Sequence, residues 1–362
     1  MNEVLSKSLI SFCCKNYFDK RYNKEIRGLL TNPLEWDFII EESLGDGTFQ
    51  FIYPSLKENR DILPENILNR LEKVYLKEVA CDVYLLYEAE KALRSLNQQK
   101  IPVMALKGTA FAETIYFGTN TRAMCDIDIL VREKDLDAVQ KSLFELGYKF
   151  LFTVEGNHST YVKKGREGVR MEVHWDIYDR PNPLKKYSLG IDLDEIWEDA
   201  VPIKVGKEEV LGMSPEDLII YLCCHGLKDF YTTPKWLIDF DRLIKYYGKT
   251  LDWKKVIEKT KRYRVKKAVY YSFEYVNELF NDLIPENVLS TLRPRRFQRL
   301  DRFALKKTMQ TDAPMFWRFL LYFCCIDGLL YKIMALSELP VYRLKRFLRP
   351  NIAKGSRPSS LF

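Results

Sequence analysis

A change in hydrophobic period near residue 99 constrains the fold of this chain more than any other feature of its sequence. Residues 65–97 contain no Gly or Pro, and their apolar positions recur mostly at steps of three or four, which is typical of a long amphipathic helix. From residue 101 the apolar residues form short runs instead, IPVMAL at 101–106 and DIDILV at 126–131, which have the length of buried strands. The two patterns together predict an α+β fold.

A chain of 362 residues is long for a single domain and has enough residues for two. The sheet core is predicted to contain strands 101–106, 126–131, 159–162 and 169–177, a helix from Thr109 to Gly118 and a helix at 136–146. Ser214 caps a later helix that has Pro215 in its first turn. We therefore predict a small sheet domain flanked by helical regions, with a N-terminal helical region at 1–98, an α/β core at 99–180, a linker and small β-hairpin at 181–213, and a C-terminal helical domain with a basic tail at 214–362.

The cysteines and the apolar segments indicate a cytoplasmic protein. Eight cysteines include three adjacent pairs but no C-x-x-C, and adjacent thiols do not make a tetrahedral metal site by themselves. The N-terminus lacks the apolar core of a signal peptide. The longest charge-free run in the apolar stretch 314–336 is 319–326, far shorter than the roughly 20 residues of a membrane span. We expect reduced, mostly buried thiols and no transmembrane helix.

Positive charge is concentrated near the C-terminus. Residues 293–362 contain 15 Lys/Arg and 4 Asp/Glu, a net charge of +11, whereas the whole chain carries +7. The clustered basic residues are Arg293, Arg295, Arg296, Arg299, Arg343, Lys345, Arg346 and Arg349. This tail predicts an anionic partner, either nucleic acid or an acidic membrane to which the protein would bind peripherally. A solvated tail or simple helix packing is the alternative.

Two aspartates lie two residues apart in the second predicted strand. Period two places Asp126 and Asp128 on one face and the neighbouring isoleucines on the other. Two carboxylates held side by side repel each other, so a positive charge is expected between them. Mg²⁺ takes one or two carboxylates together with substrate phosphates, and Mn²⁺ is the alternative ion. On the spacing of the two aspartates alone, a pair of strand-end aspartates that cap turns is the favoured interpretation.

Further residues strengthen the prediction of a phosphate and metal site. Glu172 lies in the predicted strand VRMEVHWDI, on the same face as His174, and would bring a third carboxylate to the aspartates if the two strands pair. Lys107 and Gly108 lie between a strand and a helix, where a lysine charge and backbone N–H groups can bind phosphate, and Thr109 belongs to the same turn. Arg122 could clamp a phosphate or pair with the acids.

The three histidines leave more than one interpretation open. His174 could contact metal-bound phosphate or be a structural residue beside Trp175. His225 follows two cysteines on a predicted helix and could touch a nucleotide or simply pack. His158, in the polar turn EGNHST, is predicted to be a surface residue.

The combined motif resembles the uncharacterised bacterial nucleotidyltransferase family of the polymerase-β-like superfamily. The resemblance covers roughly residues 93–245 and consists of an LKG turn, a Tyr in the next helix, an Arg, a D-x-D strand, a later E-x-H-W and a helical His…W-x-x-D segment. These elements are Leu106-Lys107-Gly108, Tyr116, Arg122, Asp126/Asp128, Glu172-Val173-His174-Trp175, and His225, Trp236 and Asp239.

The resemblance implies a polymerase-β-like nucleotidyltransferase fold and a metal-dependent reaction. Asp126, Asp128 and Glu172 would be the metal carboxylates, and Lys107 and Gly108 would replace the Gly-Ser turn of the superfamily. The enzyme would transfer NMP from an NTP to an acceptor, which could be a small molecule, a protein or RNA, and release pyrophosphate. The alternative is a non-catalytic nucleotide-binding or regulatory module that retains the fold.

Overall fold

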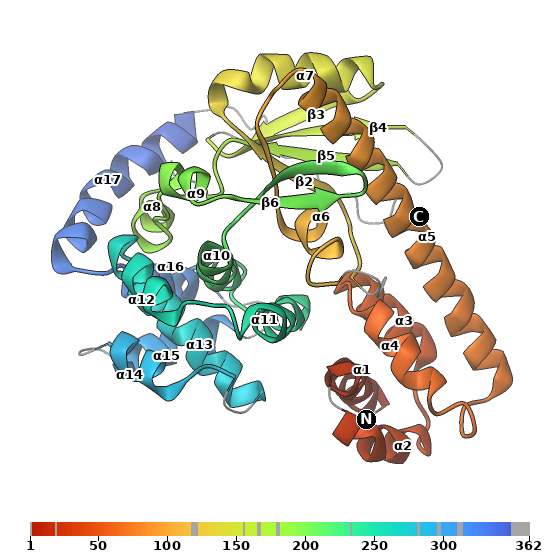
Figure 1. Cartoon of the computed structure of the whole chain (residues 1–362). Coiled ribbons are helices and arrows are strands. Elements are labelled where there is room, and N and C mark those ends of the chain that lie inside the picture. The colour runs from red at the N-terminus through yellow and green to blue at the C-terminus, as the bar shows by residue number, and fades with distance from the viewer. Residues whose placement is uncertain are drawn as a thin grey trace.

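The computed structural model describes residues 2–18, 20–116, 122–154, 156–164, 168–178, 182–231, 234–280, 283–294, 298–309 and 314–348. A seven-stranded mixed sheet lies between an N-terminal and a C-terminal set of helices (Figure 1). Its strand order is β3-β4-β5-β2-β1-β7-β6. The expected α+β class, with a small sheet flanked by helical regions, is confirmed.

The N-terminal helices pack against one another and end in one long helix. They are α1 (Asn2–Phe18), α2 (Asn23–Leu30), α3 (Trp36–Gly45), α4 (Phe49–Lys57) and α5 (Glu65–Gln98), with a short 3-10 turn, η1, at Lys20–Tyr22. The 34 residues of α5 confirm the long helix expected from the absence of Gly and Pro. Because α5 contacts α4 as well as β1, β2 and β7, it connects the N-terminal helices to the sheet.

The core of the sheet follows α5. Its elements are β1 (Val103–Ala105), α6 (Lys107–Ala112), β2 (Ile127–Val131), η2 (Glu133–Asp135), α7 (Leu136–Glu145), β3 (Lys149–Val154), β4 (His158–Lys163) and β5 (Val169–His174). The pair β2–β5 is parallel, whereas β1–β2, β3–β4 and β4–β5 are antiparallel. Strand β3 was not predicted, since it is an edge strand whose Phe150 and Leu151 are both exposed and show no alternation.

The predicted hairpin is present and extends this sheet. It consists of β6 (Val201–Val205) and β7 (Glu208–Gly212), and it follows the short helices α8 (Pro183–Ser188) and α9 (Leu193–Glu198). Strand β7 pairs with β1 in parallel, so the hairpin forms one edge of the sheet.

The C-terminal helices begin as the sequence predicts. They are α10 (Pro215–Lys228), α11 (Pro234–Tyr247), α12 (Trp253–Arg262), α13 (Lys266–Phe280), α14 (Glu286–Leu292), α15 (Gln298–Thr308), α16 (Met315–Cys325) and α17 (Leu329–Leu348). The Ser214 hydroxyl accepts a hydrogen bond from the backbone N–H of Asp217 (3.2 Å), which confirms the expected cap. None of the described helices is both long and apolar enough to cross a membrane.

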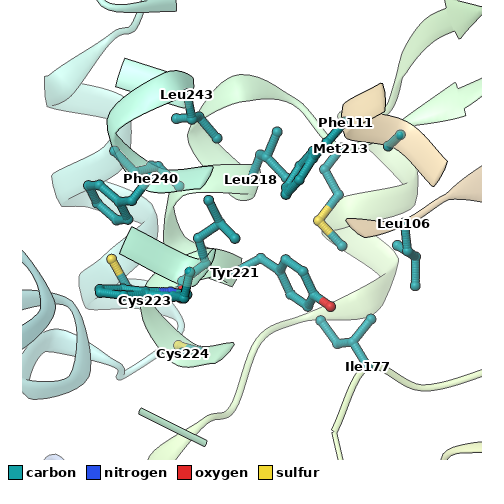
Figure 2. Close-up of a cluster of buried hydrophobic side chains, with 14 of the residues drawn as sticks. Leu106, Phe111, Ile177, Met213, Leu218, Tyr221, Cys223, Cys224, Phe240 and Leu243 are labelled. Atoms are coloured by element: carbon teal, nitrogen blue, oxygen red, sulfur yellow. The ribbon is translucent and has the colours of Figure 1, made fainter. Parts of the chain in front are cut away.

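Buried side chains join the C-terminal helices to the sheet. In Figure 2, Tyr221 of α10 lies among Leu106, Ile177 and Met213, which come from the strand side of the interface. Phe240 of α11 belongs to the same buried cluster. Six of the eight cysteines are buried and all eight are free thiols, as expected.

A fully buried lysine fixes α12 against α10 and α9. Lys259 Nζ lies 2.6 Å from Asp217 Oδ2 and 2.7 Å from Asp199 Oδ2, and the side chains of Lys259 and Asp217 have 0% exposure. Because a buried charge is costly without its partner, removing one member should cost far more than the pair contributes.

We predict that Lys259→Met lowers the free energy of unfolding by about 3 kcal/mol, because it leaves Asp217 buried without its cation. Lys255→Met is the matched control on the same helix, since Lys255 pairs only with the partly exposed Asp199 (3.1 Å) among the ion pairs recorded for it. Its cost should stay below about 1 kcal/mol. Urea unfolding curves measure both values, and equal losses in the two variants would contradict the prediction.

Candidate active site

Strand register gathers the predicted site residues on one face of the sheet. Asp128 of β2 is the direct partner of Glu172 in the parallel neighbour β5, and paired residues project to the same face. On the other side of β5, β4 places His158 opposite His174 and Thr160 opposite Glu172. The strands therefore bring two carboxylates, two imidazoles and a hydroxyl to one face.

The three predicted carboxylates meet at this face. Oxygen atoms of Asp126, Asp128 and Glu172 all lie within 4.8 Å of one another. Burial and, to a smaller extent, the charge of Asp128 raise the pKa of Asp126 to about 6. Burial would raise the pKa of Asp128 as well, but the Lys107 ammonium and the hydrogen bond from His174 lower it.

Lys107 is the cation closest to the aspartates. Its Nζ donates to Asp128 Oδ1 (2.9 Å), and although burial opposes the charge, the Asp128 carboxylate raises the pKa of Lys107 above its ordinary value. Its backbone has φ +41°, a strained conformation for a residue other than Gly, and such conformations cluster at functional sites. On the other side of the acids, Arg170 Nη2 donates to Glu172 Oε1 (2.6 Å).

The turn after β1 differs in detail from the prediction. Helix α6 begins at Lys107 and ends at Ala112, so Thr109 is not its cap, and the expected stop at Gly118 lies outside the described residues. The Thr109 hydroxyl instead accepts a hydrogen bond from the backbone N–H of Asp128 (3.1 Å), which ties the turn to the aspartate strand. That long-range bond, rather than the local sequence, determines the position of the hydroxyl.

Arg122 contacts an acid other than Asp126 and Asp128. Its Nε and Nη2 donate to the two carboxylate oxygens of Asp239 on α11 (2.8 and 2.9 Å), and Tyr116 donates to the same carboxylate (2.9 Å). A Cβ on Gly108 would lie 2.6 Å from Arg122 Nη1, so the glycine lets the guanidinium pass over the turn. Of the two alternatives for Arg122, pairing with an acid is the one observed, and the acid is Asp239.

Two of the three histidines lie beside the carboxylates. His174 Nε2 is 3.0 Å from Asp128 Oδ1 and 3.5 Å from Glu172 Oε2. His158 was predicted to be a surface residue, and this prediction is wrong: its side chain is only 13% exposed, and its ring centroid lies 4.8 Å from that of His174. The polar turn before it suggested exposure, but β4 begins at His158 and turns the ring onto the site face.

His225 lies at the other wall of the site. Its Nδ1 is 3.2 Å from Asp229 Oδ2 one helical turn later, and its ring packs edge-on to Tyr221 at 5.8 Å. Burial lowers the pKa of His225 to about 4, so the imidazole is neutral at pH 7.

A cavity of about 220 Å³ opens beside the aspartates. Its wall combines the Lys107-Gly108 turn, both aspartates and α10 and α11 side chains, and these residues are Lys107, Gly108, Phe111, Arg122, Met124, Cys125, Asp126, Asp128, Tyr221, Leu222, His225, Asp229, Lys235, Trp236 and Asp239. No sequence pattern identified Tyr221 or Lys235 as site residues, although Lys235 directly precedes the tryptophan of the family-like segment. A pocket lined by both cations and carboxylates can hold a polyphosphate and a divalent cation together.

The segment that precedes the aspartates is held from two sides. Asp82 of α5 accepts hydrogen bonds from Gln50 Nε2 of α4 (2.5 Å) and from the backbone N–H of Met124 (2.8 Å). Lys235 of α11 donates to the carbonyl of Ala123. Burial raises the pKa of Asp82 to about 6, even though both hydrogen bonds lower it.

Comparison with known proteins identifies the family of this chain. A model of the family described as "Uncharacterised nucleotidyltransferase" matches residues 32–281, from before α3 to just after α13. Among solved structures, an antigenic nucleotidyltransferase-like protein from Paracoccidioides brasiliensis matches with 15% identity and a TM-score of 0.37, over 59% of this chain and 93% of that chain. No curated protein matches the sequence.

We predict that Asp82→Asn gains stability relative to the unchanged protein as the pH rises from about 4 to 7. The folded state holds a proton on Asp82 up to about pH 6, whereas the unfolded chain releases it near 3.8, so the stability provided by this group is complete at low pH and is lost as the pH rises. The difference between the two proteins should grow by up to about 3 kcal/mol.

Urea unfolding at several pH values measures this difference. Asp137→Asn, which changes an exposed aspartate of α7, is the control and should show no such trend. A stability difference for Asp82→Asn that is independent of pH would contradict the prediction.

Proposed function

This chain belongs to the uncharacterised nucleotidyltransferase family, and we propose that it transfers a nucleoside monophosphate from an NTP to an acceptor hydroxyl in a metal-dependent reaction. In that reaction the acceptor oxygen forms a bond to the α-phosphorus, the bond from that phosphorus to the β-bridging oxygen breaks, and pyrophosphate leaves. A carboxylate of the site takes the acceptor proton.

The convergence of Asp126, Asp128 and Glu172 carries the proposal. Three carboxylates within 4.8 Å of one another, two of them nine-tenths buried, repel unless a cation joins them. Burial is the largest cause of the raised pKa of Asp126, and the charges of Asp128 and Glu172 add to it. Their donor set is oxygen only, which suits Mg²⁺ or Mn²⁺.

A bound divalent cation of this kind would neutralise phosphate charge and stabilise the leaving oxygen. The residues of the chain have separate tasks. Lys107 already contacts Asp128 and faces the cavity, so its ammonium can bind a phosphate oxygen. Gly108 and Thr109 belong to the same turn, where Gly108 leaves room for Arg122 Nη1, beside which a phosphate would bind. Lys235 and His225 line the same cavity as further contacts for the NTP.

Arg122 contributes to the site through Asp239. With two hydrogen bonds to that carboxylate and its guanidinium 5.2 Å from the Phe111 ring centroid, Arg122 is held in place before substrate binds. We therefore propose that Arg122 positions the turn and the cavity wall. Its Nη1, which lies beside Gly108, would contact a phosphate of the NTP.

We also propose that the protein acts in the cytoplasm and binds peripherally to an anionic membrane. The C-terminal region supports the membrane contact. Its last described helix, α17, exposes a stripe of large apolar side chains at helical spacing: Leu329, Leu330, Ile333, Leu336 and Val341. Arg343 follows on the same helix and is exposed. Arg295, Arg296 and Arg349 lie outside the described residues, as do the side chains of Lys345 and Arg346. An apolar stripe within a C-terminal segment, residues 293–362, of net charge +11 suits binding to an acidic lipid surface.

We predict that Asp128→Asn lowers nucleotide transfer at least about 100-fold, because it removes a charge from the proposed metal ligands and the partner of Lys107. Asp126→Asn should have a similar effect and keeps the Lys107–Asp128 ion pair. The assay incubates the chain with Mg²⁺, α-labelled NTPs and cell extract as the source of acceptor. Label transfer and pyrophosphate release are measured, and Asp137→Asn on the opposite side of the sheet is the control.

Two outcomes would count against the enzyme. Equal transfer by the wild-type chain and by Asp128→Asn would place the chemistry elsewhere. Calorimetric binding of NTP without pyrophosphate release, with every extract tested, would favour the non-catalytic nucleotide-binding module.

We predict that the full chain sediments with vesicles that contain phosphatidylserine and not with neutral vesicles or labelled RNA. Leu330→Glu combined with Ile333→Glu should weaken vesicle binding at least about 10-fold, because each apolar side chain that enters the membrane contributes about 1.5–3 kcal/mol. Val83→Glu, which changes an equally exposed apolar residue of α5, is the control. Binding to RNA alone, or to neither, would contradict the membrane assignment.

A further inference from the structure

A second group of metal-binding side chains lies next to the carboxylates and is distinct in chemistry. His158, Glu172 and His174 each offer one ligand atom, and these atoms lie within 4.8 Å of one another. Their side chains are 13%, 10% and 6% exposed, so all three are largely withdrawn from bulk water. Only Glu172 is shared with the oxygen-only group.

The spacing of these atoms is wrong for hydrogen bonds and right for a shared cation. Glu172 Oε2 lies 3.6 Å from His158 Nε2 and 3.5 Å from His174 Nε2. Neither distance is that of a good hydrogen bond. Ligands at about 2.0–2.2 Å from a tetrahedral Zn²⁺ are separated by about 3.3–3.5 Å, which is close to what is observed.

The ring of His158 is oriented as that of a metal ligand. Asn157 Nδ2 donates to the carbonyl of Asp176 (3.1 Å), which leaves Asn157 Oδ1 to accept from His158 Nδ1 at 2.5 Å. A hydrogen on Nδ1 leaves the lone pair of the neutral ring on Nε2, and that lone pair faces the Glu172 carboxylate. This is the arrangement of a ligating histidine whose other nitrogen is held by a second residue.

Polar atoms around the group remain unsatisfied in the part of the chain that the structure describes. Thr160 Oγ1, directly across the strand pair from Glu172, and His174 Nδ1 are both buried without a hydrogen-bond partner there. Asp128 Oδ1 lies 3.0 Å from His174 Nε2 and 2.9 Å from Lys107 Nζ. Once His174 Nε2 gives up its proton to bind a cation, this oxygen keeps the Lys107 hydrogen bond and has a lone pair for the same cation, as a fourth ligand atom.

We propose that His158, His174 and Glu172, with Asp128 as the fourth ligand, form a site for a transition-metal ion of the Zn²⁺ or Co²⁺ type. Two imidazole nitrogens favour these ions over Mg²⁺, which prefers oxygen ligands. The site competes with the carboxylate cluster for Glu172 and Asp128, so a transition metal bound here withdraws two ligands from that cluster and leaves Asp126. The inference does not require the transfer activity, because its test measures metal binding alone.

The test uses the full chain, without a histidine tag and stripped of metal, titrated with Co²⁺ or Zn²⁺ in the presence of excess Mg²⁺. We expect one equivalent of Zn²⁺ by calorimetry and visible ligand-field absorption with Co²⁺. His158→Ala should weaken both at least about 10-fold. His225→Ala, which changes the remaining histidine of the chain, is the matched control and should bind as the unchanged protein does.

A readout on the unchanged protein covers the case in which His158→Ala fails to fold. Proton NMR of the Co²⁺-loaded chain should show two exchangeable, hyperfine-shifted imidazole N–H signals, one from each ligating histidine. Equal affinity in the unchanged chain and in a folded His158→Ala, the absence of shifted imidazole signals, or full displacement of Co²⁺ by Mg²⁺ would each overturn the proposal. Loss of transfer activity with metal binding retained would instead count only against the proposed function.

Discussion

The parallel pairing of β2 with β5 is the interaction on which the site depends. It sets Asp128 directly beside Glu172, so two carboxylates that would otherwise repel are fixed on one face by backbone hydrogen bonds between buried strands. Two cationic side chains offset this repulsion, since Lys107 contacts Asp128 and Arg170 contacts Glu172. A shift of one residue in this register would turn Glu172 to the opposite face and leave Asp128 with no carboxylate partner from β5.

Helices from both ends of the chain hold the segment that enters β2. Asp82 of α5 binds the backbone of Met124, while Lys235 and Asp239 of α11 bind Ala123 and Arg122. Side chains from before and after the sheet therefore contact three consecutive residues, 122–124, which lie just before Asp126. This arrangement gives the helical regions a direct mechanical link to the cavity, because a movement of α5 or α11 would displace the strand end that carries Asp126.

What the sequence could predict follows from the range of the interactions involved. The period of two in β2, the Gly-free run of α5 and the Ser214 cap are local patterns, and the structure has all three. The pairing of Arg122 with Asp239 joins residues 117 positions apart, and no local pattern identifies which acid an arginine will meet. His158 was misassigned for a related reason: its neighbours in sequence are polar, but its neighbours in space are His174 and Glu172 across the strand pair.

The surroundings of Glu172 differ from those of the aspartates, because other side chains contact Glu172 from both sides. The aspartates face the Lys107 turn, where the ligands are oxygen atoms, whereas β4 brings an imidazole toward the far side of Glu172. Burial raises the pKa of Glu172, but His174, His158 and Lys107 together lower it to about 2, so the carboxylate stays ionised throughout the physiological pH range. Because Glu172 lies between an oxygen-rich and a nitrogen-rich group of ligand atoms, its carboxylate can bind a hard cation or a softer one. It cannot be a full ligand in both groups at the same time. The preference of this face for a hard or a softer cation would thus depend on β4, a strand that contributes none of the carboxylates.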